Sequence, residues 1–126
     1  MMKEYNTKVS DVYVVIGPHI DECCYIVNEE RANYFKDNFT PLCVTPVKDG
    51  EEIKGAWDNG SGQLYHLSLT KANIASLKDF GVLDSHITIC TDCTCCNFLY
   101  GSNRRETMAS GEKDKFTVMA SFISNR

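Results

Sequence analysis

The chain has 126 residues, of which 43% are hydrophobic and 24% charged, and its formal net charge is −4. This length fits one domain with its own core, and the acidic balance argues against a basic surface for nucleic acid or anionic membranes. No apolar run approaches the roughly 20 residues that a membrane-spanning helix needs, and the first residues hold no apolar signal core. We therefore expect a single cytoplasmic domain over residues 1–126 that binds neither nucleic acid nor a membrane.

The first half of the chain predicts two strands separated by a helix. An apolar, β-branched run over residues 12–16 stops at Gly17-Pro18, which predicts a buried strand followed by a tight loop. Asn28 can cap a helix that continues to residue 36. Residues 42–47 are again apolar and β-branched and predict a second strand.

The middle of the chain predicts a short strand followed by the clearest helix. Residues 51–62 form a loop-like stretch, and residues 63–67 predict an edge strand. Ser68 caps a helix over residues 69–80, whose apolar side chains repeat at helical spacing, and Gly81 supplies its C-terminal stop.

The last third predicts two more strands. Residues 86–89 form a strand that runs directly into a cysteine-rich stretch, residues 101–115 are polar and loop-like, and residues 116–123 have good β-propensity. The order strand–helix–strand–helix–strand–strand indicates an α/β or α+β fold, with a mixed β-sheet and flanking helices.

The cysteines are many for this length, and their number is odd. Cys90 and Cys93 have the CxxC spacing that lets two thiolates bind one zinc ion, but a structural zinc site normally needs four ligands. The sequence offers no second knuckle, although Cys23 or Cys24 could contribute through space. The alternatives are small buried apolar side chains near a strand end, or redox thiol chemistry. The seven are Cys23, Cys24, Cys43, Cys90, Cys93, Cys95 and Cys96.

Two further groups are candidates for chemistry. Cys23 or Cys24, just after the Gly-Pro loop, could be a nucleophile with His19 as its base, or both cysteines could be packed beside a surface histidine. Arg104-Arg105 could bind a phosphate or carboxylate through a guanidinium fork, or form a solvated basic pair in a polar loop.

Several separated segments resemble the YfiH-like family, also called laccase-domain or polyphenol-oxidase-like proteins, in the same order along the chain. The resemblance spans nearly the whole sequence, and the ordered set is more specific than any single motif. The segments are Ile16-Gly17-Pro18-His19-Ile20, Cys24-Tyr25-Ile26-Val27, His66-Leu67-Ser68-Leu69, Ala72-Asn73, Gly81-Val82, Cys93-Thr94-Cys95-Cys96-Asn97, Ser102-Asn103-Arg104 and Met119-Ala120-Ser121-Phe122-Ile123.

The resemblance implies a layered α/β/β/α fold and a zinc-dependent enzyme that acts on purine nucleosides. Phosphorolysis, adenosine deamination and methylthioadenosine cleavage are the activities it implies, and older naming makes family members copper laccases. Arg104 is the best candidate for a group that faces substrate or phosphate. The other motif-matched candidates for substrate or phosphate binding are Ser102, Cys24, Tyr25 and Asn73, the last on the apolar side of its helix.

The sequence departs from the family pattern in two respects. The family's later "tGR" arginine has no clear counterpart, because Ser110-Gly111 is followed by Glu112. The family's metal ligands lie in an "ADCxP" and a "HAGWRG" segment, and neither occurs here. The chain therefore resembles the C-terminal half of the family domain, and we expect no family metal and no catalysis by this chain alone. Its partners would be a purine nucleoside and phosphate in the complete enzyme, and an N-terminal half or a second copy of the chain.

Two alternatives to the enzyme hypothesis remain. One is a small thiol-rich zinc-binding module that uses Cys90 and Cys93 with one or two further cysteines, among Cys95, Cys96, Cys23 and Cys24. The other is a non-catalytic partner subunit that docks onto a separate N-terminal half.

Overall fold

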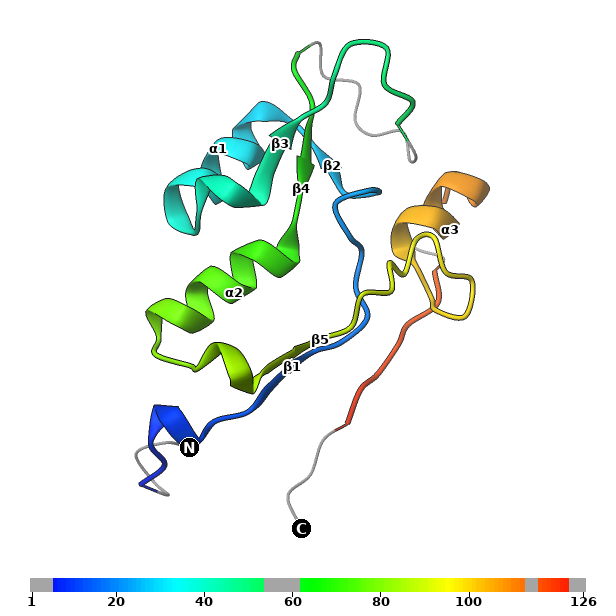
Figure 1. Ribbon diagram of the computed structural model, residues 1–126. Helices are drawn as coiled ribbons and strands as arrows, with labels where there is room; N and C mark the ends of the chain where they lie inside the picture. The colour runs from blue at the N-terminus through cyan, green and yellow to red at the C-terminus, as the bar shows by residue number, and fades with distance from the viewer. Residues whose placement is uncertain (1–5, 54–61, 113–115, 123–126) are drawn as a thin grey trace.

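The computed structural model describes residues 6–53, 62–112 and 116–122 of the chain. Within these residues the chain forms two small β-sheets with α-helices beside them, and none of these helices is long and apolar enough to cross a membrane (Figure 1). Most of the predicted loop at 51–62 lies outside the described residues. The helices and strands, in chain order, are β1 (Val14–Ile16), β2 (Ile26–Val27), α1 (Glu29–Asn38), β3 (Val44–Pro46), β4 (Tyr65–Leu67), α2 (Leu69–Asp79), β5 (Ile87–Ile89) and α3 (Asn103–Ser110), with short 3-10 turns at Val9–Asp11, Pro41–Cys43 and Asp84–His86.

Strands β2, β4 and β3 form an antiparallel sheet in that order, and α1 and α2 lie beside it (Figure 1). Val27 pairs with Tyr65, and Val44 pairs with Leu67. Buried side chains from all three strands pack together with side chains of the helices in a single apolar core. Its buried members are Val27, Ala32, Cys43, Val44, Leu67 and Ala72.

The two longer helices begin where side chains satisfy free backbone N–H groups. The Asn28 side chain accepts the N–H three residues further on at 3.0 Å, and the Ser68 hydroxyl does the same at 3.3 Å. After α2, Gly81 has a φ of 97°, in the left-handed region that glycine adopts without strain. The predicted helices at 28–36 and 69–80 are therefore confirmed.

Strands β1 and β5 form a separate, two-stranded parallel sheet with Val14 opposite Ile87. Its pairing continues past both strands, because Cys90 N donates to Ile16 O at 2.8 Å and Thr94 N donates to His19 O at 2.9 Å. The loops that follow β1 and β5 therefore leave from the same end of the sheet and remain hydrogen-bonded to each other (Figure 1).

The structure corrects two predictions in the last third of the chain. The stretch 101–115, predicted as a polar loop, contains α3, which begins after Ser102 and ends at Gly111 with a φ of 71°. The predicted strand at 116–123 is wrong over its described part, because residues 116–122 pair with no strand among the described residues. Without a neighbouring strand, β-propensity alone does not produce a strand.

The predicted class is confirmed, since the chain combines helices with both parallel and antiparallel strand pairs. The strands divide between two sheets, one packed against helices and one that leads into the cysteine-rich loops.

Candidate functional site

A hollow of about 490 Å³ lies where the loop before β2, the start of α1 and the start of α3 meet. Its apolar lining comes from Ile20 and Leu64 and from β2. Its polar groups come from Tyr25, Arg31, Ser102 and Arg104, among others. Three residues that the family resemblance selected, Tyr25, Ser102 and Arg104, therefore share one hollow although they lie up to 79 positions apart in the sequence.

Arg104 is 8% exposed and its guanidinium lies over the Tyr25 ring, 5.5 Å from the ring centre. Burial lowers the pKa of Arg104 to about 10, so the side chain remains a cation at neutral pH. Arg31 Nη1 donates a hydrogen bond to Tyr25 Oη at 3.2 Å. Two cations therefore contact one tyrosine in a chain whose net charge is negative, and such a site suits a phosphate or carboxylate group.

Ser102 has a structural task within the hollow. It is 5% exposed, its Oγ accepts from Arg105 N at 3.3 Å, and its own N–H donates to the Glu106 carboxylate at 2.9 Å. These bonds cap the N-terminus of α3. Ser102 therefore fixes the start of the helix that carries Arg104.

Arg105 was not selected by the sequence as a separate residue, and the structure gives it a distinct role. Its Nη1 donates to Thr94 O at 2.6 Å and to Cys95 O at 3.1 Å, and its Nη2 donates to Tyr100 O at 2.6 Å. The guanidinium also lies 4.7 Å from the centre of the Phe98 ring. The interpretation of Arg104-Arg105 as a solvated basic pair is thus wrong, because one arginine is buried in the hollow and the other holds the cysteine-rich loop.

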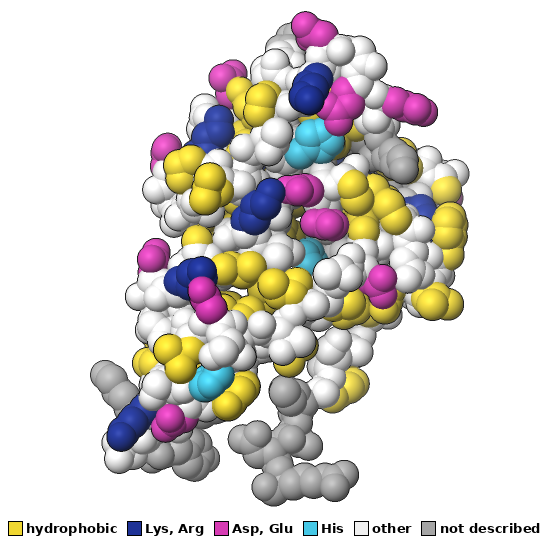
Figure 2. Space-filling view, viewed as in Figure 1, with side chains coloured by type: hydrophobic (Ala, Val, Ile, Leu, Met, Phe, Trp, Pro, Cys, Tyr) yellow, Lys and Arg dark blue, Asp and Glu magenta, His cyan; other side chains and the backbone are white. Residues whose placement is uncertain are grey.

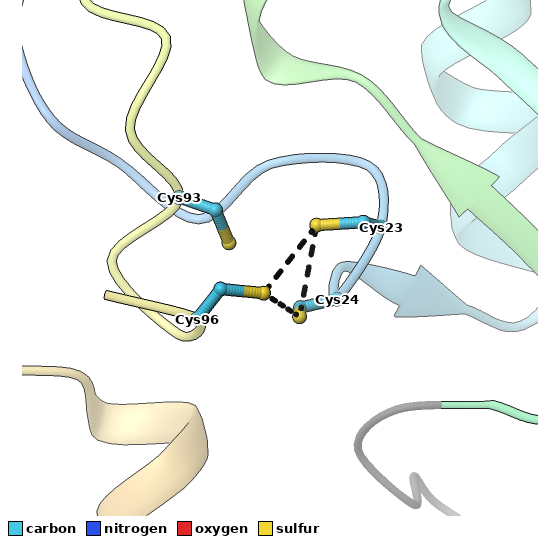
Figure 3. A group of neighbouring side chains, drawn as sticks. All are labelled: Cys23, Cys24, Cys93 and Cys96. Atoms are coloured by element: carbon cyan, nitrogen blue, oxygen red, sulfur yellow. Dashed lines mark hydrogen bonds between the residues drawn. The ribbon is translucent and has the colours of Figure 1, made fainter. Parts of the chain in front are cut away.

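Four of the seven cysteines form a compact cluster (Figure 3). The sulfurs of all four lie within 4.8 Å of one another, with Cys23 Sγ 3.8 Å from Cys24 Sγ and from Cys96 Sγ, and Cys24 Sγ 3.3 Å from Cys96 Sγ. Cys93 is the fourth member, whereas Cys90 and Cys95 are not part of the cluster. Cys90 and Cys93, whose CxxC spacing suggested a shared zinc ion, therefore do not lie in one cluster. Cys93 lies instead with Cys96, which follows it at the same spacing.

The surroundings of the cluster shift the pKa values of its thiols in different directions. Burial, together with the neighbouring thiols, raises the pKa of Cys23 to about 12 and raises that of Cys24 still further. Burial also acts to raise the pKa of Cys93, but backbone N–H groups, above all that of Asp21 at 3.3 Å, outweigh it and lower the pKa. Cys93 thus becomes a thiolate more readily than Cys23 or Cys24.

Two other sequence-based candidates do not join a site. The ring nitrogens of His19 lie 2.9 Å from Gly17 O and 2.7 Å from Thr70 Oγ1, so their hydrogen-bond partners are not Cys23 or Cys24. Asn73 is exposed on α2 and does not line the hollow. Its predicted place on the apolar side is wrong, because α2 turns Ala72 rather than Asn73 into the core.

Comparisons with known proteins connect the chain to one family. The family described as multi-copper polyphenol oxidoreductase laccase matches residues 1–123. A purine nucleoside phosphorylase, YlmD of Geobacillus stearothermophilus, is 33% identical over 118 residues, which are 93% of this chain and 37% of the relative. The chain therefore spans little more than a third of the curated relative that it matches.

Two solved structures have a fold similar to that of this chain. The crystal structure of YlmD from Geobacillus stearothermophilus superposes with a TM-score of 0.59 at 30% identity, over 83% of this chain and 36% of that one. The hypothetical protein YfiH of Bacillus licheniformis gives a TM-score of 0.65 at 23% identity with the same coverage, and this likeness concerns the fold alone.

The ligand segments that the resemblance assigns to the family's metal do not occur in this chain. The family's "ADCxP" and "HAGWRG" segments are absent from the sequence. Among the described residues, the one group of metal-ligand side chains is the cysteine cluster, and no histidine belongs to it. His66 is bonded to Glu51 and to Glu22 O, and His86 stacks on Tyr13.

Proposed function

Because the chain belongs to the multi-copper polyphenol oxidoreductase laccase family, we propose that it forms the C-terminal part of an enzyme that cleaves purine nucleosides with phosphate. The observation that carries this proposal is the 33% identity over 118 residues to a purine nucleoside phosphorylase. An alignment of 118 of the 126 residues includes the residues that line the hollow and the whole of α3.

The hollow supplies groups that suit the phosphate. In phosphorolysis an oxygen of phosphate forms a bond to the sugar carbon C1′ as the bond from C1′ to the purine nitrogen breaks, and the purine leaves with a proton. Arg104 and Arg31 both line the hollow, and in this proposal they bind a phosphate oxygen by charge-assisted hydrogen bonds. Tyr25, which contacts both arginines, orients them, and Ser102 fixes the start of α3.

In this proposal the chain depends on a further segment for activity. Since the ligand segments of the family's metal do not occur in this chain, we expect that the chain needs a segment carrying the "ADCxP" and "HAGWRG" ligands. We therefore expect the chain by itself to be catalytically silent. Its seven cysteines are all free thiols, which suits a reducing compartment, and we place the protein in the cytoplasm.

The test is a fusion of this chain to the part of Geobacillus stearothermophilus YlmD that precedes the matched region. We expect phosphate-dependent release of purine from inosine or adenosine by the fusion and none by the chain alone. Arg104→Met in the fusion should lower kcat/KM about 10- to 100-fold, mainly through the KM for phosphate, as the loss of a charge-assisted hydrogen bond predicts. Lys78→Met, which removes an exposed ion pair with Asp84, is the control and should change little.

Purine release by the chain alone would contradict the proposal, as would a folded fusion whose activity ignores phosphate. Ammonia release from adenosine in the same assay would redirect the proposal from phosphorolysis to deamination.

A non-catalytic, thiol-rich zinc-binding module is the second candidate, and the cysteine cluster favours it. A folded fusion without any nucleoside-cleaving activity, together with bound zinc, would select this alternative. The same result would be expected of a non-catalytic partner subunit, which co-purification with a separate N-terminal half would identify.

A further inference from the structure

The cysteine cluster joins two loops that are far apart in the sequence. Cys23 and Cys24 lie on the loop between β1 and β2, whereas Cys93 and Cys96 lie on the loop after β5 (Figure 3). Their sulfurs point toward a common centre, and no histidine or carboxylate takes part among the described residues. A set of four sulfur donors from two rigidly paired loops is the donor set of structural zinc sites.

The distances suit one tetrahedral ion. With Zn–S bonds of about 2.3 Å, the sulfurs of a regular tetrahedron lie about 3.8 Å apart. Two of the sulfur–sulfur distances here are 3.8 Å, a third is 3.3 Å, and all remain within 4.8 Å. Small shifts of the thiol side chains therefore produce the required geometry.

The surrounding backbone already holds the two loops in register. Thr94 N donates to His19 O at 2.9 Å, and Asp21 N donates to Cys93 Sγ at 3.3 Å. The turn that contains Cys93 and Cys96 is closed by the bond from Cys96 N to Cys93 O at 3.1 Å. Backbone N–H groups directed at a sulfur are the usual outer contacts of a metal-bound thiolate, and they orient the ligand before the ion arrives.

Burial and charge also favour a bound cation. Cys24 and Cys93 are 1% and 8% exposed, while Cys23 and Cys96 are open to solvent, so an ion can enter from one side and be held on the other. Four thiolates and one Zn²⁺ leave a net charge of −2. Arg105 lines a second hollow together with Cys24 and Cys96, and its positive charge offsets part of that negative charge.

We propose that Cys23, Cys24, Cys93 and Cys96 bind one zinc ion as a tetrahedral thiolate site that ties the loop after β1 to the loop after β5. This site is separate from the family's metal, whose ligand segments the chain lacks, and it does not depend on the proposed enzymatic function. Its role is structural, since all four ligands come from the protein and no open position is left for a substrate.

The first experiment is a titration of the reduced, metal-free chain with Co²⁺ and then Zn²⁺. We expect thiolate-to-cobalt charge-transfer absorption of tetrahedral S₄ type that saturates at about one ion per chain and disappears on addition of zinc. An octahedral cobalt spectrum, or absorption without saturation, would overturn the proposal.

Four substitutions locate the ligands. Cys93→Ser and Cys96→Ser should weaken zinc binding by more than about tenfold, whereas Cys90→Ser and Cys95→Ser should leave it unchanged. The last two are matched controls, because they remove the same chemical group from the same loop. Loss of zinc binding with Cys90→Ser but not with Cys96→Ser would overturn the proposal. It would assign the ligand role to the Cys90–Cys93 pair instead.

A measurement on the unaltered chain covers the case in which the cysteine variants do not fold. Zinc should protect Cys23, Cys24, Cys93 and Cys96 from alkylation and leave Cys90 reactive, and a chelator should remove the protection. Peptide mapping that finds disulfides within the cluster in freshly reduced, zinc-supplemented protein would overturn the proposal, as would equal protection of all seven cysteines.

Discussion

The chain combines two regions with different interiors. The sheet–helix region, made of β2, β4, β3, α1 and α2, encloses an apolar core that includes Leu67 and Ala72. The loop region, made of β1, β5, the loops that follow them and α3, buries mainly sulfur and polar groups. These buried groups are Cys24, Cys93, Thr94, Ser102 and Arg104.

Apolar side chains of the loop region lie largely on the outside. Phe98 and Leu99 are 83% and 89% exposed, and hydrophobic side chains gather on the face that Figure 2 shows over α3 and the loop before it. Parallel strands usually have both faces covered, but Tyr13 and Val15, on or next to β1, are mostly exposed. The sheet–helix region is therefore stabilised by non-directional packing, and the loop region by a small number of directed bonds.

The largest effect is expected in the sheet–helix region. Leu67 is fully buried, so Leu67→Ala should remove packing and leave a cavity that costs about 2–5 kcal/mol of unfolding free energy. Urea denaturation followed by circular dichroism measures it. Leu99→Ala, on the exposed side chain in the loop region, should stay within about 0.5 kcal/mol. Similar losses for both variants would mean that the two regions do not differ in the way described.

The next effect concerns the bonds that hold the cysteine-rich loop. Arg105→Met leaves the carbonyls of Thr94, Cys95 and Tyr100 without their donor, and should cost about 1–3 kcal/mol locally. Amide hydrogen exchange should accelerate at residues 94–100 and stay constant in α1 and α2. Uniform acceleration along the chain would show that the loop region has no separate stability.

A smaller effect compares the same substitution in both regions. Ser68→Ala and Ser102→Ala each remove a helix N-cap and should each cost about 1 kcal/mol. The first should lower the global unfolding free energy, because α2 belongs to the core. The second should accelerate hydrogen exchange in α3 alone. A lower global unfolding free energy in Ser102→Ala would show that α3 unfolds together with the core.

The smallest effect is a pH dependence of the C-terminal segment. Hydrogen bonds from the N–H groups of Ser102 and Thr117 hold the pKa of Glu106 below its usual range. A lowered carboxyl pKa contributes stability above the unfolded value of about 4.3, and this contribution is lost as pH falls through the folded value. NMR signals of residues 116–122 should therefore shift in that acidic window. Glu106→Gln should abolish the shift, and an unchanged profile in that variant would assign it to another group.

The helices of the sheet–helix region were accessible from the sequence because their signals are local. Ser68, the helical repeat of apolar residues and Gly81 lie within one short stretch, and each acts through its own turn of backbone. The α/β class follows from the same signals.

Helix α3 has similar signals at both of its ends, although the sequence analysis predicts a loop there. Ser102 caps the N-terminus, the Glu106 carboxylate accepts a hydrogen bond from the Ser102 N–H, and Gly111 ends the helix in the left-handed region. The sequence of α3 has no apolar stripe, because the helix buries only Arg104. The end signals were sufficient to find the helix.

The membership of the cysteine cluster was not accessible from spacing. The overlapping pairs Cys90–Cys93 and Cys93–Cys96 have the same separation, and only the tertiary structure distinguishes them. Cys90 still belongs to the strand pairing, because its N–H bonds to Ile16 O, whereas the turn after Cys93 brings Cys96 toward the other loop. Likewise, the hollow around Arg104 depends on contacts between distant segments that no local pattern specifies.

The separation of the clustered thiols along the chain has a consequence for the order of folding during synthesis. Cys96 follows Cys23 and Cys24 by 73 and 72 positions, so the first pair leaves the ribosome long before its partners exist. Helices α1 and α2 and the antiparallel sheet lie entirely within that interval. Once they have folded, they shorten the span that the remaining chain must close, which reduces the entropy lost when the second pair arrives. We expect the nascent chain to complete its apolar core first and to assemble its sulfur cluster last.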